Sequence, residues 1–519
     1  MVSCYKRQSL CLLKRHHHRS LLTRHLSTAE TPLTSKIAIV GTGPSAFYTA
    51  HSLLRSQPNL QLTFFEKLPT PFGLSRYGVA PDHSEVKSCE SILVELSQNR
   101  NVQIYTNVEI GKDISVKELK QNFHSIVFAY GTSEEVRLRV EGEEQGHSKG
   151  VILTSREFVD WYNGNPLWDS NKAVDLSTVK DVTIIGNGNV AMDIARLLLC
   201  PVEQLAGTDI MDRAVGGLRT SAVERVNIVA RRGILQSAFA TKELRELIQL
   251  EQHGVKFESV EGQDLGSIAG IVKKADRVIK RKVETIVNAL RPLSERKLKY
   301  QVSEKFDKFW NLQYLKSPTA FQFNEKNQIQ VEFTTNAIQL DSPMKVVPTE
   351  TKQYHTTDLV ITSLGYKSQP LPDFPVNNIS FNDKTGTITT NGKYQILNSE
   401  TNEPLEGLYA TGWLTKESKG AILNQVGSGM ALAEIIVSDL QKGQMLRRSD
   451  EHNSESLDLN KLTTWKDWVK LDTFEKQLGQ DMGKLRVKLQ DLQTMKQVQD
   501  ADSELELDQL KKNITQRSN

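Results

Sequence analysis

The sequence predicts an α/β fold of two similar domains, with the second domain inserted into the first. Two segments each read as a buried strand, a glycine-rich turn and a helix, and their turns start at Gly41 and Gly186. Strand-like segments at 357–365 and 407–413 are placed to return the chain to the first domain. With 38% hydrophobic and 24% charged residues, and no apolar run near the roughly 20 residues of a membrane span, the composition fits a soluble globular protein.

The first turn carries the residue types that a bound dinucleotide needs. Residues 36–40 form an apolar strand, and the turn from Gly41 to Ala46 has the GxGxxA spacing. Gly41 permits the tight turn, Gly43 lets a pyrophosphate approach the backbone, and Ala46 lets the helix pack closely on the strand. The next strand, 60–65, ends at Glu66, whose carboxylate suits ribose hydroxyls. Since a carboxylate about 4 Å from a 2′-phosphate costs roughly 4 kcal/mol, this site should hold FAD or NAD.

The second turn repeats the fingerprint with the opposite charge beside it. A strand at 181–185 leads into Gly186-Asn187-Gly188-Asn189-Val190-Ala191, and a helix follows. After an inserted stretch at 203–224, the next strand ends in Arg231 and Arg232. Guanidinium groups are natural partners of a 2′-phosphate, so this site should hold NADPH and the first site FAD. Arginines at a strand end are often only solvated, and that alternative stays open.

These patterns predict two Rossmann-like dinucleotide-binding domains, the NADPH domain inserted into the FAD domain. The first part of the FAD domain should take residues 36–140, and the NADPH domain residues 141–356. The second part of the FAD domain, with a C-terminal extension, should take residues 357–500. The tail at 501–519 carries no pattern that predicts a role.

Residues 1–35 differ from the rest of the chain in charge. They are rich in Arg, Lys and His, with leucines between, and Glu30 is the only acid. This composition is typical of a mitochondrial transit peptide, with cleavage near Leu26 or Ser27, and a disordered basic tail is the alternative. Because the whole chain carries only +3, the remainder is slightly acidic, which argues against a nucleic-acid-binding protein.

The four cysteines, Cys4, Cys11, Cys89 and Cys200, form no CxxC pair. This spacing argues against a metal site, a bound iron–sulfur cluster and a disulfide framework. It also removes the redox-active dithiol that disulfide reductases place beside their flavin. Electrons should therefore leave directly from the flavin.

Longer motifs extend these patterns beyond the glycines. They are the two fingerprints and the segments 71–74 (PFGL), 78–83 (GVAPDH), 155–164 (SREFVDWYNG), 231–233 (RRG), 239–247 and 465–468 (WKDW). On these residues the chain resembles the mitochondrial NADPH–adrenodoxin (ferredoxin) reductase family, which has a glutathione-reductase-like fold, from about residue 36 to about residue 500. The resemblance implies an FAD-dependent enzyme that takes a hydride from NADPH and passes single electrons to a [2Fe–2S] ferredoxin.

The resemblance also implies roles for individual residues. The expected FAD contacts are Gly41, Gly43, Ser45, Ala46, Glu66, Leu74, Ile110, Trp413, Gly420, Ala421 and Ile422. The expected NADPH contacts are Gly186, Asn187, Gly188, Asn189, Val190, Arg231, Arg232, Glu243 and Gly420. His83 and Asp193 match a charged pair near the flavin and are the expected catalytic residues; an ordinary loop histidine and a helix aspartate are the alternative. Tyr130 and Lys419 stand where the family usually has threonine.

A basic stretch lies at 268–290. Its apolar residues recur at helical spacing, and Lys and Arg crowd the rest of the predicted helix. Such a patch would steer an acidic partner, although a charge run is usually just a solvated face. The resemblance implies that an acidic [2Fe–2S] ferredoxin of the adrenodoxin type docks at Arg245, Lys280 and Arg281.

The expected function is electron transfer from NADPH through FAD to a mitochondrial ferredoxin. It would support iron–sulfur cluster assembly, haem or quinone maturation, or steroid-type hydroxylation. The alternatives are an NADPH-dependent flavin monooxygenase, which needs an organic-substrate pocket, and a redox-inert nucleotide-binding scaffold. We expect a monomer in the mitochondrial matrix, with no metal and no nucleic-acid partner. Peripheral contact with the matrix face of the inner membrane stays open.

Overall fold

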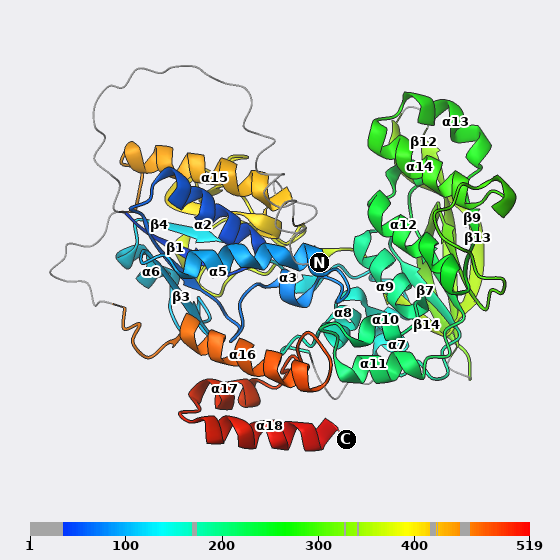
Figure 1. Cartoon of the computed structure of the whole chain (residues 1–519). Helices are drawn as coiled ribbons and strands as arrows, with labels where there is room; N and C mark the ends of the chain where they lie inside the picture. Colours follow the sequence, from blue (N-terminus) through cyan, green and yellow to red (C-terminus); the bar gives the residue numbers. More distant parts are fainter. Residues whose placement is uncertain are drawn as a thin grey trace. The chain divides into compact units, whose positions relative to one another are not determined.

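The structure is a computed structural model, drawn in Figure 1. It describes residues 35–168, 174–325, 328–339, 342–415, 422, 424–446 and 457–518. The predicted transit peptide, apart from its last residue, lies outside the described residues, as do Gly420, Ala421 and Lys419. Among the described helices, none is long and apolar enough to cross a membrane.

The first sheet has seven strands in the order β18-β19-β4-β1-β2-β3-β20. Their bounds are β1 Lys36–Val40, β2 Gln61–Phe65, β3 Val102–Thr106, β4 Ser125–Phe128, β18 Gln395–Leu397, β19 Pro404–Ala410 and β20 Thr463–Thr464. The five central strands run parallel, and the short edge strands β18 and β20 pair antiparallel. Because β19 pairs with β4, the expected return of the chain near residue 407 is confirmed.

Helix α2 (Pro44–Ser56), which starts at the first glycine turn, packs against α15 (Asn424–Gln441) (Figure 1). The two backbones approach closely at Gly429, where an added Cβ would meet the Thr49 nitrogen at 2.8 Å. Shorter helices of this domain are α3 Leu74–Tyr77, α4 Ser84–Lys87, α5 Ser91–Ser97 and α6 Val116–Asn122. The close contact ties the C-terminal part of the FAD domain to its first helix.

The second sheet has six parallel strands in the order β6-β14-β7-β8-β10-β9. Their bounds are β6 Ile152–Thr154, β7 Asp181–Ile185, β8 Arg225–Val229, β9 Val255–Glu261, β10 Lys308–Gln313 and β14 Leu359–Thr362. The expected return strand at 357–365 is therefore wrong in its domain. β14 lies between β6 and β7 in the second sheet, so the chain leaves this sheet after Thr362 and not at residue 357.

The helices of the second domain lie mainly on one face of its sheet. They are α7 Glu143–Ser148, α8 Ser155–Asn163, α9 Asn189–Leu199, α10 Glu203–Ala206, α11 Asp212–Arg219, α12 Thr241–Gln249, α13 Leu265–Lys274 and α14 Arg277–Ala289. Alternate strand residues, such as Val226 and Ile228, pack with these helices in one buried cluster. This arrangement leaves the second glycine turn at the start of α9.

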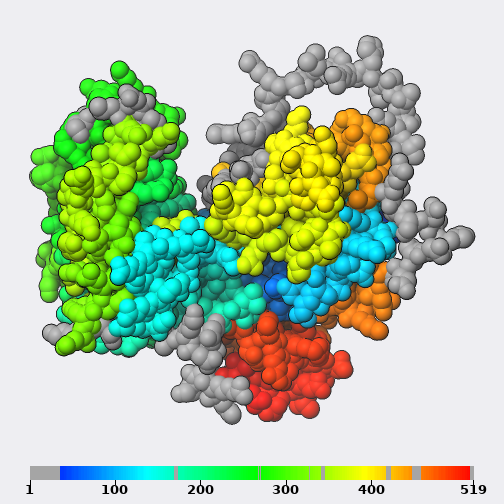
Figure 2. All heavy atoms as spheres, turned by 180° about the vertical axis from the view of Figure 1, so that it is seen from behind, coloured from blue at the N-terminus to red at the C-terminus, as the bar shows by residue number. Residues whose placement is uncertain are grey.

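An antiparallel sheet of β11 (Lys316–Phe323), β12 (Ile329–Gln339) and β13 (Ser342–Thr357) covers the opposite face. Val229 and Val360 of the parallel sheet pack there against Phe333 in a second cluster. In Figure 2 the yellow-green residues of the three-stranded sheet form part of the molecular surface. Both faces of the parallel sheet are thus covered, as parallel sheets require.

Two short strands join the domains. β5 (Glu134–Glu135) leads from the first sheet to the second, and β15 (Tyr366–Lys367) leads back. They pair antiparallel with each other. The insertion of one nucleotide-binding domain into the other is therefore confirmed, and the connections form a two-stranded ribbon.

The chain ends in three helices, α16 (Trp465–Asp481), α17 (Leu492–Asp500) and α18 (Glu504–Ser518). The apolar spacing from 485 to 498 indicates one helical face, but only residues from 492 onward are helical. Met495 and Val498 are fully buried, whereas Leu485 is 60% exposed. The non-helical segment before α17 is held by polar contacts, which apolar spacing does not reveal.

Candidate functional site

The first glycine turn has the geometry that a pyrophosphate needs. Gly41 has φ +103°, and an added Cβ would lie 2.6 Å from the Ala129 carbonyl oxygen. At Gly43 an added Cβ would meet no described atom within 4 Å, so the backbone there is open to a ligand. Gly43 is the N-cap of α2, and no described side chain caps this helix. Pro44 has no N–H and the Ala46 N–H bonds to the Gly43 carbonyl at 3.0 Å, so the Ser45 N–H is the group of the first turn that can bind a phosphate oxygen.

Glu66 lies directly beside this turn. Its side chain is buried, and one carboxylate oxygen accepts hydrogen bonds from the Thr42 backbone N–H at 3.0 Å and the Thr42 hydroxyl at 2.5 Å. The other oxygen accepts the Leu68 N–H at 3.1 Å. Burial raises the pKa of Glu66, and these hydrogen bonds oppose the shift. The carboxylate is thus held at the turn, as a ribose-binding acid would be.

Two other residues expected at FAD, Ser45 and Trp413, follow the carboxyl ends of β1 and β19. The Ser45 hydroxyl lies against Gly412, where an added Cβ would clash with it at 2.2 Å. Trp413 stacks on Tyr366 of the linker, with ring centroids 5.7 Å apart. Ligands of open α/β sheets bind at such strand ends.

Three further residues expected at FAD occupy different environments. The Ile110 side chain is 3% exposed and belongs to the core of the first domain, so its backbone is the part available to a ligand. Leu74, at the start of α3, and Ile422 are half-buried. Tyr130, which departs from the family pattern, donates a hydrogen bond from its hydroxyl to the Gln369 carbonyl at 2.8 Å. This tyrosine therefore ties the end of β4 to the returning linker.

The second glycine turn repeats the geometry of the first. Gly186 has φ +126°, and an added Cβ would lie 2.0 Å from the Ser363 carbonyl oxygen. At Gly188 the Cβ position is open, and this residue is the N-cap of α9, again without a described side-chain cap. The Asn189 side chain accepts the Ala240 N–H at 2.7 Å, and the Asn187 carbonyl accepts the Phe239 N–H at 3.0 Å. These bonds fix the start of α12 beside the turn.

Two features near this turn suit NADPH. Arg231 and Arg232 follow the end of β8 and are both exposed. Glu243, on α12, has one carboxylate oxygen that is buried and has no hydrogen-bond partner among the described residues. A buried acceptor without a partner is costly to the protein alone, so a donor from a bound ligand would satisfy it. The residues present therefore fit NADPH at the second turn and FAD at the first.

His83 joins the two domains through a pair of carboxylates. Its Nδ1 lies 3.8 Å from Asp193 Oδ1, so the structure brings the expected catalytic pair together. Its Nε2 lies closer, at 2.9 Å, to Glu246 Oε2 on α12, a residue that the sequence did not single out. The sequence signal that could have identified Glu246 is its position three residues after Glu243, on the same face of the helix. Arg196 completes the cluster with ion pairs to Asp193 and Asp82.

The charges in this cluster stabilise one another. Burial lowers the pKa of His83, but the hydrogen bond to Glu246 and the charge of Asp193 outweigh it, so the pKa is raised. Burial alone would raise the pKa of Glu246, yet the bond from His83 holds it below its usual value. Burial raises the pKa of Asp193. The favoured arrangement is an imidazolium of His83 paired with the carboxylate of Glu246.

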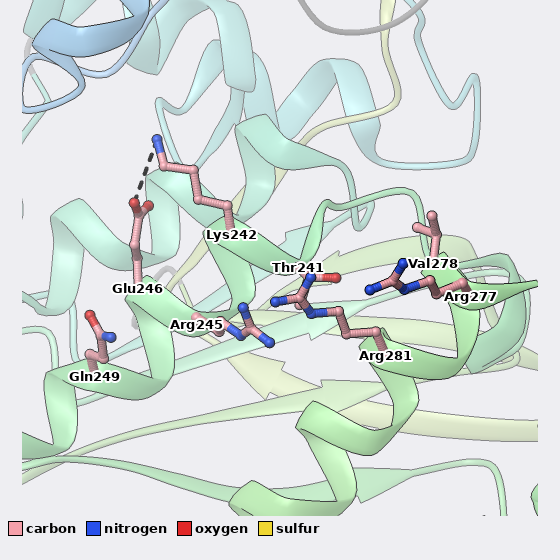
Figure 3. A pocket seen from close by; sticks show the side chains of 8 residues that line it. All are labelled: Thr241, Lys242, Arg245, Glu246, Gln249, Arg277, Val278 and Arg281. Carbon is pink, nitrogen blue, oxygen red and sulfur yellow. Dashed lines mark ion pairs between the residues drawn. The ribbon is translucent and has the colours of Figure 1, made fainter. Parts of the chain in front are cut away.

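Figure 3 shows the side chains that line a basic pocket formed by α12 and α14. The volume of this pocket is about 510 Å³. Arg245 of α12 and Arg277 and Arg281 of α14 line it, together with Thr241, Lys242, Glu246, Gln249 and Val278. The expected Arg245 and Arg281 are therefore together. Lys280 is exposed on α14 but does not line the pocket, whereas Arg277, which we did not expect there, does.

The predicted helix at 268–290 is two helices. Asp276 caps α14 by accepting the N–H groups of Val278 and Ile279 at 2.8 and 2.9 Å, which breaks the helix before Arg277. The break rotates the faces of the second half, so Lys282 is buried and donates to the Ser237 carbonyl at 2.5 Å. The same rotation places Arg277 and Arg281, one turn apart, beside Arg245.

Comparisons with known proteins agree with this geometry. Residues 35–285 match the family described as pyridine nucleotide-disulphide oxidoreductase. The chain is 37% identical to the probable mitochondrial NADPH:adrenodoxin oxidoreductase of Saccharomyces cerevisiae, covering 90% of this chain and 96% of that one. It is 34% identical to the mitochondrial NADPH:adrenodoxin oxidoreductase of Bos taurus, covering 91% and 93%.

Solved structures give the same result. The structure described as Mycobacterium tuberculosis FprA in complex with NADPH is 30% identical to this chain, with a TM-score of 0.75, and the match covers 90% of this chain and all of that one. Membership in a family of NADPH-dependent oxidoreductases explains both glycine turns, the acid beside the first turn and the arginines beside the second. The chain belongs to the NADPH:adrenodoxin oxidoreductase family and is an FAD-dependent oxidoreductase that uses NADPH.

Proposed function

We propose that this enzyme passes electrons from NADPH through FAD to an acidic [2Fe–2S] ferredoxin of the adrenodoxin type. The observation that carries the proposal is the composition of α12. Within one helix, Glu243 lies at the NADPH turn, Glu246 bonds His83, and Arg245 lines the basic pocket. A residue that we assign to NADPH, a member of the charged cluster and part of a basic surface therefore lie on a single helix.

In this proposal the residues at the two turns hold the dinucleotides. Gly41, Gly43, Ser45, Ala46, Glu66, Leu74, Ile110, Trp413, Gly420, Ala421 and Ile422 bind FAD. Gly186, Asn187, Gly188, Asn189, Val190, Arg231, Arg232, Glu243 and Gly420 bind NADPH. When bound, FAD accepts a hydride from NADPH and can release the two electrons one at a time.

His83, Asp193 and Glu246 form the polar wall between the two domains. The imidazolium of His83 is hydrogen-bonded at Nε2 to Glu246, at 2.9 Å, and its Nδ1 faces the carboxylate of Asp193 at 3.8 Å. Its positive charge favours negative charge nearby. A proton on Nε2 can move to Glu246 without a change in the positions of the heavy atoms, and Arg196 holds Asp193 for this arrangement.

The basic pocket gives the ferredoxin a place to dock. The three arginines that line it are exposed, and Lys280 adds a fourth positive charge on the exposed side of α14. Arginine pairs well with carboxylates because its guanidinium presents several donors in a fixed plane. At physiological salt, charges are screened over about 8 Å, so this local cluster decides docking more than the net charge of the enzyme, which is slightly acidic without residues 1–35.

The names of the relatives in Saccharomyces cerevisiae and Bos taurus place those proteins in mitochondria. We propose that this chain is a monomer of the mitochondrial matrix, carried there by residues 1–35. Its ferredoxin would serve iron–sulfur cluster assembly, haem or quinone maturation, or steroid-type hydroxylation.

The test uses the purified FAD-loaded enzyme with a [2Fe–2S] ferredoxin and cytochrome c. We expect cytochrome reduction to require the ferredoxin. The charge reversals Arg245→Glu, Arg277→Glu and Arg281→Glu together should raise the KM for ferredoxin at least about tenfold at low salt. Reduction of ferricyanide, which needs no docking surface, should be unchanged. A matched control is Lys384→Glu, at an exposed lysine outside the pocket. An unchanged ferredoxin KM in the triple variant would refute the docking surface, and substrate-dependent oxygen uptake would favour a monooxygenase.

A further inference from the structure

A fully buried lysine amine lies where three parts of the chain meet. The Nζ of Lys488, whose side chain is 0% exposed, lies 3.0 Å from Asp209 Oδ2. It also donates to the Arg76 carbonyl at 3.2 Å and to the Asn163 side-chain oxygen at 3.4 Å. Arg76 belongs to α3 of the FAD domain, while Asn163 and Asp209 belong to the NADPH domain. Lys488, from the C-terminal extension, therefore touches both domains.

The segment around Lys488 runs along the inserted stretch 203–224. Lys484 Nζ lies 2.7 Å from the Ile210 carbonyl oxygen and 2.6 Å from Asp212 Oδ1. The Leu485 N–H donates to the Gly207 carbonyl at 3.2 Å, and the Arg213 guanidinium donates to the Gln490 side chain. The insertion, which separates the second glycine turn from the arginine pair in the sequence, thus binds the C-terminal segment.

The other side of the segment is bound to the FAD domain. Glu475 of α16, 0% exposed, accepts two hydrogen bonds at 2.7 Å from the buried guanidinium of Arg76. Glu475 also accepts the Leu489 N–H at 2.9 Å. Lys87 of the FAD domain reaches Asp209 directly, at 2.7 Å to both carboxylate oxygens. Asp209 is therefore shared by one lysine of the FAD domain and one of the C-terminal extension.

From these contacts we infer that the insertion 203–224 and the segment 484–490 form a clasp between the domains, and that Lys488 is a positioning residue for hydride transfer from NADPH to FAD. The clasp borders the segment that carries His83, because Asn163 also donates to the Tyr77 and Val79 carbonyls at 3.1 and 3.0 Å. The linker ribbon of β5 and β15 pairs only two residues of each strand. Together with the His83–Glu246 and Arg196–Asp82 contacts, the clasp restricts the rotation that so short a ribbon allows.

Positioning of this kind has a measurable effect. The nicotinamide and flavin rings react only when they are stacked, and a displacement of about 1 Å far from the chemistry can cost on the order of 100-fold in rate. Without Lys488, Asp209 would pair with Lys87 alone. The contacts of Lys488 Nζ with Arg76, Asn163 and Asp209, which connect the C-terminal extension to both domains, would be lost. The inference needs NADPH and FAD but no ferredoxin, so failure of the docking proposal would leave it standing.

The test compares Lys488→Met with Lys484→Met in the FAD-loaded enzyme under anaerobic conditions. We expect Lys488→Met to slow flavin reduction by NADPH at least about tenfold, with Kd for NADPH within about threefold of wild type. Lys484→Met should act in the same direction with a smaller effect. Hydrogen exchange should rise at 203–219 and 484–490 in both variants and stay unchanged in β1 and β7.

The control is Arg296→Met, which breaks a different buried ion pair of the NADPH domain, with Arg296 Nη2 2.6 Å from Glu251 Oε2. The side-chain hydrogen bonds of Glu251 go to Arg296 and Tyr300 and not to the clasp. Arg296→Met should lower the melting temperature without slowing flavin reduction. The inference is overturned if both lysine variants reduce the flavin at the wild-type rate, or if their rates fall no more than that of Arg296→Met. If Lys488→Met fails to fold, Lys484→Met decides on the same two readouts.

Discussion

Removal of Glu246 tests the charged cluster at the domain boundary. In Glu246→Gln the side chain that lies 2.9 Å from His83 Nε2 keeps its size but loses its negative charge. A hydrogen bond between charged groups contributes about 1.5–3 kcal/mol, and one pKa unit corresponds to about 1.4 kcal/mol. We therefore expect the pKa of His83 to fall by about 1–2 units. Asp193→Asn should lower it less, because Asp193 lies 3.8 Å from the ring and is shared with Arg196.

The assay is an NMR titration of the His83 ring protons in wild type and both variants, followed by thermal unfolding at several pH values. Since the pKa of His83 is raised in the folded state, its pairing stabilises the protein below the unfolded pKa of about 6.5. That stabilisation is lost as the pH rises through the folded pKa, and Glu246→Gln should reduce it. An unchanged His83 titration in Glu246→Gln, or a larger shift in Asp193→Asn, would refute the reasoning.

Three further predictions follow from the two turns and the linker. Arg231→Ala with Arg232→Ala should lower the preference for NADPH over NADH by about 100-fold or more, measured as the ratio of kcat/KM, because two charged hydrogen bonds are lost; an unchanged ratio contradicts the site assignment. Gly188→Ala, at φ −86° with an open Cβ position, should raise the KM for NADPH about tenfold while FAD content stays normal. Gly43→Ala should lower the FAD content while the KM for NADPH of the FAD-loaded fraction stays normal. Equal loss of both cofactors in either variant would point to misfolding. Burial raises the pKa of Glu135 from 4.5 to about 7, so the folded state holds the extra proton and stability should fall by at most about 3 kcal/mol as pH rises through this window; Glu135→Gln should flatten that fall in melting temperature between pH 5 and pH 8.

The parts of the fold that local sequence determines were predictable. A glycine such as Gly41 or Gly186 is needed because the backbone adopts a positive φ there, and this conformation is set within the turn itself. The carbonyl oxygens that an added Cβ would meet within 3 Å belong to Ala129 and Ser363, which are far away in the chain. The sheet to which β14 belongs was not predictable in this way. Its sequence indicates a buried parallel strand, but pairing with β6 and β7 depends on residues far away in the chain.

The site shows the same division. The acid at one turn and the arginines at the other follow directly from strand ends, whereas the bond between His83 and Glu246 joins residues of different domains. The basic pocket depends on a helix break that the sequence did not predict. Asp276 caps the second helix, and on that helix Arg277, and not Lys280, lines the pocket. Buried ion pairs such as that of Arg76 with Glu475 leave no periodic signal at all.

The most direct test mixes the anaerobic FAD-loaded enzyme with NADPH and an excess of oxidised [2Fe–2S] ferredoxin, and follows the ferredoxin's own visible and electron paramagnetic resonance spectra. The proposed function predicts two reduced ferredoxins for each NADPH consumed, at a rate that falls with added salt. If NADPH is consumed while the ferredoxin stays oxidised, or if the ferredoxin is reduced equally fast without the enzyme, the proposed electron path is contradicted.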